Sequence, residues 1–166
     1  MPAVEVSSRL VASRSAVWSV VSTMDGVNAE LGPWLRMTYP DDQASLADAV
    51  PGRIAFRSWI LLLGLVPLDR HTLALDRVDA HGFVEESTSW MQRRWRHERE
   101  LVDDVGGGCV VTDRLVFEPR FTLSRPVLAG VVRTVFNHRH RRLRRRFGAN
   151  VAVRGSRPTI DGGAEG

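Results

Sequence analysis

The last long segment with helical periodicity, residues 124–147, constrains the fold of this chain more than any other stretch. Its sequence is SRPVLAGVVRTVFNHRHRRLRRRF, in which apolar residues recur at helical spacing and form one stripe: Leu128, Val132, Val135, Phe136, Leu143 and Phe147. Ser124 is a suitable N-cap, Pro126 fits the first turn, and Gly148 is placed to end the helix. At about 1.5 Å per residue this helix extends about 36 Å, which is enough to lie across a whole sheet.

Most of the chain before this helix has strand patterns. Alternation of apolar and polar residues predicts strands over 3–12, 34–39, 53–62, 67–78, 83–91, 94–102 and 109–118. Two short helices are expected at 15–23 and 25–31. Tight turns between consecutive strands predict an antiparallel meander. The fold class is therefore α+β, with an antiparallel curved sheet of about seven strands wrapped around the long C-terminal helix and two short helices after the first strand.

Length and composition indicate one domain. A chain of 166 residues can bury a proper core, and we expect a single domain over residues 1–148 followed by a disordered tail over 149–166. The longest apolar stretch, residues 59–68, is too short to span a membrane. The single cysteine excludes an internal disulfide, and the first ten residues do not resemble a signal peptide, so a cytoplasmic location is expected.

The order of the elements is accompanied by several characteristic segments: VEVSSRLVASRSAVWSVVSTMDGV, GLVPLDRHTLALDRVD, WRHERELVDD, VVTDRLVFEP and FNHRHRRLRRRFG. Together they resemble the helix-grip fold of the START-like superfamily, also called SRPBCC, in a bacterial branch. That superfamily includes polyketide cyclase/dehydrase and lipid-transport-like proteins, and the resemblance covers about residues 3–148. It implies a cavity between sheet and helix that takes a small hydrophobic ligand. Members range from carriers to cyclases, so the resemblance alone does not decide between a binding protein and an enzyme.

Three polar residues fall on strand faces that are expected to point inward: His71, His97 and Asp113. A buried carboxylate needs a partner, which Arg99, Arg139 or a histidine can supply. Such a patch can orient a ligand or act as an acid–base pair. It can also be a structural ion pair between strands, which is the commoner case, so no residue is assigned as catalytic.

The residues expected to bind the ligand combine this patch with aromatic and helix positions: Trp59, His71, Trp95, His97, Asp113, Val132, Phe136 and Arg139. Plain core packing is the alternative for the aromatic members. The apolar segment 61–65 can cover the ligand, contact a membrane or join a dimer. No metal or cofactor is expected, because no cysteine or acid completes a ligand set with the histidines, and His138 is expected to be solvated.

All 23 basic residues are arginines, and the net charge of +4 is unevenly distributed. Residues 125–147 hold eight arginines and no acid, whereas the rest of the chain carries 15 arginines against 19 acids. Such a block can bind nucleic acid or an anionic membrane. We favour a solvated face that complements the helix dipole and pairs with acids on the sheet: Glu85, Glu86, Glu98 and Glu100.

The sequence therefore predicts binding or transport of a small hydrophobic ligand. Two alternatives stay open: a polyketide cyclase/dehydratase-like enzyme, and an interaction module that uses the arginine-rich helix. Nucleic acid is not the expected partner, whereas peripheral membrane contact is compatible with the sequence. Either a monomer or a homodimer fits it equally well.

Overall fold

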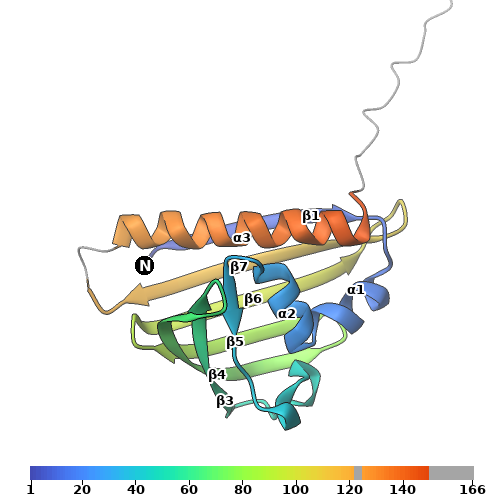
Figure 1. Ribbon diagram of the computed structural model, residues 1–166. Coiled ribbons are helices and arrows are strands. Elements are labelled where there is room, and N and C mark those ends of the chain that lie inside the picture. Colours follow the sequence, from blue (N-terminus) through green and yellow to red (C-terminus); the bar gives the residue numbers. More distant parts are fainter. Residues whose placement is uncertain (122–124, 150–166) are drawn as a thin grey trace, which may run out of the picture.

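A computed structural model describes residues 1–121 and 125–149 of the chain. Seven antiparallel strands form one sheet in the order β1-β7-β6-β5-β4-β3-β2. The strands are β1 (Ala3–Leu10), β2 (Leu35–Met37), β3 (Arg53–Leu62), β4 (Val66–Asp79), β5 (Gly82–Ser89), β6 (Gln92–Asp103) and β7 (Cys109–Pro119). The long helix α3 (Arg125–Phe147) runs beside β1 along one side of the curled sheet (Figure 1). The predicted helix-grip architecture is confirmed.

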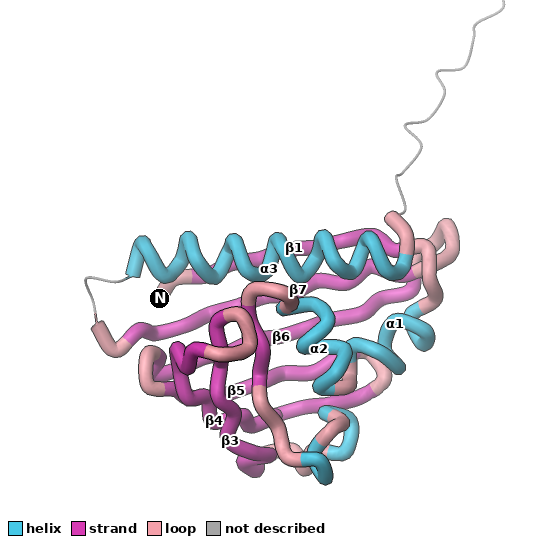
Figure 2. The backbone as a smooth tube through the Cα atoms, viewed as in Figure 1, coloured by secondary structure: helices cyan, strands magenta, loops and turns pink. Residues whose placement is uncertain are grey.

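Two short helices, α1 (Arg14–Val21) and α2 (Met24–Leu31), connect β1 to β2 and pack against the end of α3 (Figure 2). Each begins at a hydroxyl N-cap: Ser13 accepts a hydrogen bond from Ala16 N, and Thr23 accepts one from Gly26 N. The segment between β2 and β3 contains two 3₁₀ turns, Asp41–Gln43 and Leu46–Asp48.

Irregular pairing bends the sheet. The register shifts between Ile54 and Phe56 and between Ile60 and Leu61 on β3, and again where β4 meets β5 and where β6 meets β7. A bulge increases the local twist and bends its strand. These shifts therefore help the sheet to curl, so that its inner face encloses a volume instead of lying flat.

The buried apolar side chains form three clusters. The first joins α2 to β3, β4 and β5, the second joins α1 to β1, β6, β7 and the end of α3, and the third joins β1 and β7 to the middle of α3. Phe56 and Phe83 belong to the first cluster, and Phe117 and Phe136 to the third. Members of the first and third clusters face each other across the cavity described below.

The C-terminal end of α3 is fixed to the sheet. Gly148 has φ +76°, as its predicted helix-ending position requires. The backbone N–H groups of Val11 and Ala12 donate to the carbonyls of Gly148 and Phe147. The predicted N-cap Ser124 and the predicted tail lie outside the described residues, apart from Ala149, which bridges to Leu10. Among the described helices, none combines the length and apolar character needed to cross a membrane.

Candidate functional site

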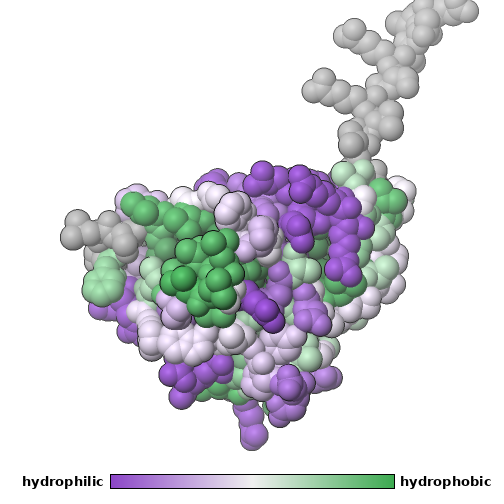
Figure 3. Space-filling view, in the orientation of Figure 1, coloured by the Kyte–Doolittle hydropathy of each residue, from purple (hydrophilic) through white to green (hydrophobic). Residues whose placement is uncertain are grey.

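A cavity of about 720 Å³ lies between α2, the inner face of the sheet and the first two thirds of α3. Several lining residues are also exposed, including Trp34, Met91 and Val131, so the cavity opens to solvent beside the β3–β4 hairpin. Figure 3 shows hydrophobic residues gathered on the surface over this hairpin and the beginning of α3. The opening is therefore bordered by apolar surface.

Most of the cavity wall is apolar. Its apolar members come from α2, from the strands and the segments that connect them, and from α3: Met24, Val27, Leu31, Trp34, Leu35, Met37, Leu46, Ile60, Leu62, Leu68, Leu73, Leu75, Phe83, Met91, Trp95, Leu128, Val131, Val132, Val135 and Phe136. Side chains from α3 reach the cavity because its apolar stripe faces the sheet, as the helical spacing predicted.

A histidine–carboxylate group interrupts this apolar wall. His71 on β4 and His97 on β6 lie on either side of Glu85 on the intervening strand β5. His71 Nε2 lies 2.6 Å from Glu85 Oε1, and His97 Nδ1 lies 3.6 Å from Glu85 Oε2. All three side chains line the cavity while being more than nine-tenths buried. They present a compact polar spot to whatever occupies the cavity.

Asp113 on β7 lies behind this spot, with no exposed surface of its own. Its Oδ1 accepts hydrogen bonds from His97 Nε2 at 2.9 Å and from Arg99 Nε at 2.7 Å. Its Oδ2 accepts from a terminal amino group of Arg99 at 2.7 Å and lies 3.0 Å from His140 Nε2. The predicted partners of Asp113 are therefore correct for Arg99 and for histidine, and these contacts tie β6 and β7 to α3.

Glu30 on α2 completes the buried network. Arg99 donates to both carboxylate oxygens of Glu30 at 2.8 Å, and Arg139 Nε donates to Oε2 at 2.9 Å. Arg99 thus spans two carboxylates from different elements, while Arg139 joins α3 to α2 and also borders the cavity. Bidentate pairing of this kind fixes position as well as charge.

The pKa values of the three acids follow from this pairing. Burial alone would raise the pKa of each carboxyl group, because it disfavours the charged form. Instead the Arg99 guanidinium holds the pKa of Asp113 well below its usual range, and Arg99 with Arg139 lowers the pKa of Glu30. The two histidines likewise lower the pKa of Glu85. All three acids are therefore ionised at neutral pH.

A second polar group of the cavity lies where β5 turns into β6. Ser89 Oγ accepts from the backbone N–H of Gln92, and Asp69 Oδ1 accepts from the backbone N–H of Met91. Gln92 is only 5% exposed, and its Oε1 is the one buried side-chain oxygen or nitrogen of the described residues without a hydrogen-bond partner. Asp69, Ser89 and Gln92 all line the cavity.

The structure brings together most of the residues predicted to bind a ligand. Six of the eight line the cavity: His71, Trp95, His97, Val132, Phe136 and Arg139. Asp113 lies behind the wall and contacts it through His97. Trp59 does not line the cavity; its ring packs edge-on against Trp90 at 5.0 Å, with Arg70 over its face.

Two expectations about α3 are wrong. His138 is half-buried instead of solvated, because its Nε2 lies 2.7 Å from the carbonyl oxygen of Gly32. Among the side chains that the structure describes, no arginine of α3 pairs with the acids predicted on the sheet. Glu86, Glu98 and Glu100 pair with sheet arginines on the outer face, and Glu85 pairs with histidines.

Sequence reasoning missed Glu30, Glu85 and Gln92 as parts of the site. Glu85 lies on the same strand face as Phe83, which was the available signal, but the first half of β5 is buried on both faces and alternation alone does not identify the inner one. Glu30 follows helical spacing from Val27, a buried position, while nothing local marks Gln92. Within residues 1–121 and 125–149, no group of three His, Cys, Asp or Glu side chains is arranged to hold a metal ion.

Comparison with known proteins agrees with this geometry. A family model described as "Domain of unknown function (DUF8410)" matches residues 8–147. A comparison with curated proteins found no match. Among solved structures, protein CV1439 from Chromobacterium violaceum superposes with a TM-score of 0.65 at 10% identity, covering 90% of this chain and 100% of that one.

Two proteins from Mycobacterium smegmatis are also similar in structure. A START superfamily protein has a TM-score of 0.62 at 10% identity, covering 87% of this chain and 96% of that one. Protein Ms6760 has a TM-score of 0.64 at 14% identity, covering 90% and 93%. Identities this low carry information about the fold alone, and the fold is START-like, as the sequence predicted.

Proposed function

The chain belongs to the DUF8410 family, and we propose that it binds a small hydrophobic molecule in the cavity between the sheet and α3. The observation that carries this proposal is the cavity itself, about 720 Å³ with a mainly apolar wall. Protein interiors are close-packed, so a space of this size is not a packing defect. Small-molecule sites typically measure about 300–1,000 Å³ and combine apolar walls with a few placed polar groups. The START-like fold commonly holds hydrophobic ligands, which is consistent with this proposal.

The polar group at Gln92 specifies the ligand further. A buried oxygen without a partner costs about 1–3 kcal/mol, and a ligand that donates a hydrogen bond to it recovers this cost. Gln92 lines the cavity and Oε1 can only accept, so a turn of the amide toward the ligand would pair this oxygen with a hydroxyl or N–H group at that end. We therefore expect an apolar molecule with one polar end, not a pure hydrocarbon.

Native mass spectrometry of the purified protein tests the proposal directly, since a retained hydrophobic molecule would be detected and identified. Titration with the neutral fluorescent probe N-phenyl-1-naphthylamine gives a second measurement. We expect saturable binding to one site per chain. Absence of both a retained molecule and saturable probe binding would contradict the proposal.

Two exposed valines on α3 supply a matched pair of variants. Val131 lines the cavity and is 51% exposed, whereas Val127, one turn earlier, is 70% exposed and does not line it. Neither position is buried, so Val131→Asp and Val127→Asp should both fold. Val131→Asp places a charge at the cavity wall and should weaken probe binding about tenfold, as expected for burying part of a charged group. Val127→Asp should leave probe binding within about twofold of wild type. Equal effects would place the probe outside the cavity.

The polar end has its own test. A long-chain alcohol and its methyl ether differ in the donor that Gln92 is expected to accept. In the wild type the alcohol should compete with the probe about tenfold more strongly than the ether. In Gln92→Leu this difference should disappear while probe binding persists. If Gln92→Leu still preferred the alcohol to the ether, the ligand hydroxyl would be donating to a residue other than Gln92.

Acid–base catalysis is a second candidate function, favoured by the arrangement at His71. Its Nε2 is bonded to the Glu85 carboxylate, while its Nδ1 has no hydrogen-bond partner among the described residues. A carboxylate that orients a histidine at a cavity wall is suited to move a proton to or from a bound molecule. Once a ligand is identified, His71→Gln should abolish its turnover while preserving its binding if the protein is an enzyme. Unchanged chemical fate of the ligand in wild type and variant would favour a carrier.

A further inference from the structure

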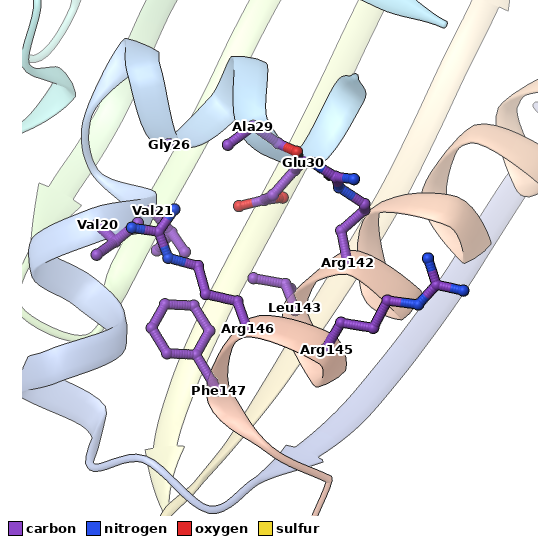
Figure 4. A pocket seen from close by; sticks show the side chains of 10 residues that line it. All are labelled: Val20, Val21, Gly26, Ala29, Glu30, Arg142, Leu143, Arg145, Arg146 and Phe147. Carbon is purple, nitrogen blue, oxygen red and sulfur yellow. Dashed lines mark hydrogen bonds between the residues drawn. The ribbon is translucent and has the colours of Figure 1, made fainter. Parts of the chain in front are cut away.

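A second, separate hollow of about 330 Å³ lies at the C-terminal end of α3, where this helix meets α1 and α2 (Figure 4). No residue lines both this hollow and the main cavity. Its floor and walls are apolar, built from Val20, Val21, Leu143 and Phe147. Arginines of the last two turns of α3 surround it: Arg142, Arg145 and Arg146.

These arginines have N–H donors that make no hydrogen bond within the described part of the chain. Arg142 uses its Nε to donate to the carbonyl of Ala29 at 3.0 Å, which leaves both terminal amino groups available. The guanidinium of Arg146 lies 5.7 Å from the ring centre of Phe147, and neither Arg145 nor Arg146 has an acidic partner in the described part of the chain. In Figure 4, Arg142 reaches toward α2 and Arg146 reaches toward α1, whereas the Arg145 side chain extends away from Val21 and Phe147.

Capping of α3 does not account for the three arginines. The carbonyls of Phe147 and Gly148 already accept hydrogen bonds from the backbone N–H groups of Ala12 and Val11. No hydrogen bond in the described part of the chain joins Arg145 or Arg146 to a carbonyl of the last turn, so these two guanidinium groups are available to a ligand.

The one acid in the hollow does not neutralise it. Glu30 is bonded through both oxygens to Arg99 and additionally to Arg139, so its charge is already compensated inside the protein. Burial would raise the pKa of Glu30, yet the two arginines lower it, so the group stays ionised and paired. The hollow consequently presents an excess of positive charge beside an apolar floor.

We propose that this hollow binds a phosphate monoester that carries a small apolar body. A phosphate dianion offers several oxygens, so it can accept hydrogen bonds from two guanidinium groups that approach from different sides. A single carboxylate would neutralise only one of the three arginines. The apolar surface of Val20, Leu143 and Phe147 provides contact for the attached organic group. The source of the monoester is either a soluble metabolite or an anionic lipid headgroup, since both present the same chemistry.

The test is an NMR titration of the full chain with phenyl phosphate, with benzoate as the comparison ligand. We expect phenyl phosphate to shift the signals of Arg146 and Phe147 and to bind about tenfold or more tightly than benzoate. The double variant Arg145→Ala/Arg146→Ala should weaken this binding about tenfold or more, the effect expected from lost hydrogen bonds to a charged group. Co-sedimentation with phosphatidylcholine vesicles containing phosphatidic acid examines the lipid source in the same variants.

A matched control separates the site from general charge. Arg93→Ala/Arg133→Ala removes the same two charges from exposed positions that line neither hollow, and it should change binding less than about twofold. Binding of phenyl phosphate supports a soluble ligand, and vesicle binding that needs Arg145 and Arg146 without phenyl phosphate binding supports a headgroup. Binding to neither probe, equal losses in the two double variants, or equal affinity for benzoate would overturn the proposal. Each variant is first checked for an unchanged circular dichroism spectrum and melting temperature.

Discussion

Replacing Asp113 by asparagine tests whether the buried network holds the sheet, α2 and α3 together. The carboxylate accepts four hydrogen bonds, two from Arg99 and one each from His97 and His140, all between 2.7 and 3.0 Å. An asparagine of the same shape keeps one acceptor oxygen and replaces the other by an NH₂ donor. Whichever way the amide is oriented, the NH₂ group faces a donor of Arg99 together with one of the two histidines.

The expected cost follows from burial. Arg99 and Asp113 have no exposed surface, and removing one partner of a buried ion pair typically costs about 3–5 kcal/mol because the other charge is left uncompensated. Glu30 still neutralises part of the Arg99 charge, so we expect a loss near the lower end, about 3 kcal/mol. This is a large share of the roughly 5–15 kcal/mol by which a domain is stable.

Urea unfolding followed by tryptophan fluorescence and by circular dichroism measures this loss. Asp103→Asn is the matched control, because Asp103 also accepts from an arginine at 3.0 Å but is 69% exposed. Its substitution should cost about 1 kcal/mol or less. If Asp113→Asn destabilised the protein no more than Asp103→Asn does, the network would not be a principal source of stability and the reasoning would be wrong.

Three further predictions follow from the same structure. The pKa values of Asp113 and Glu30 are held below their usual values, so the stability that these groups contribute is present at neutral pH and is lost as the pH falls below about 4. Measuring the free energy of unfolding across this pH range should detect the loss, and Asp113→Asn should make it smaller. Gly26→Ala should lower the free energy of unfolding by about 1–3 kcal/mol in the same urea assay, since its new Cβ would meet the carbonyl oxygen of Val20 at 1.9 Å. An unchanged urea midpoint would show that α1 and α2 can separate freely. Burial raises the pKa of the Cys109 thiol, so it should react with Ellman's reagent only after unfolding, and rapid labelling of the native protein would contradict its buried position.

Local patterns in the sequence determined the order and type of the elements. The predicted strands at 53–62 and 109–118 match β3 (Arg53–Leu62) and β7 (Cys109–Pro119) within one residue, and the predicted helix at 124–147 matches α3 (Arg125–Phe147). Alternation along the strand correctly placed His97 on the inner face of β6. Period and turn chemistry are local properties, so a single sequence is sufficient to read them.

The tertiary structure decided which charged side chains contact one another in the interior and which line a cavity or hollow. The arginine-rich end of α3 was expected to pair with sheet acids, but Arg142, Arg145 and Arg146 surround a separate hollow. Arg139 was expected to bind the ligand or a buried carboxylate, and only the structure identifies that carboxylate as Glu30. Likewise, the contact between Glu85 and both His71 and His97 arises only because β5 lies between β4 and β6 in the sheet.

The sequence by itself determined an antiparallel meander followed by a long amphipathic helix, because hydrophobic periodicity and turn residues act over a few neighbours; its START-like character was inferred from a resemblance. Only the tertiary structure decided which charges pair, that Gln92 Oε1 has no partner, and that about 720 Å³ stays unfilled between the sheet and α3. Pairing and empty volume depend on distances between segments more than a hundred residues apart, such as Glu30 and Arg139, which are separated by 109 positions. Those distances are set by the bends of the sheet and the position of α2, which no local pattern encodes.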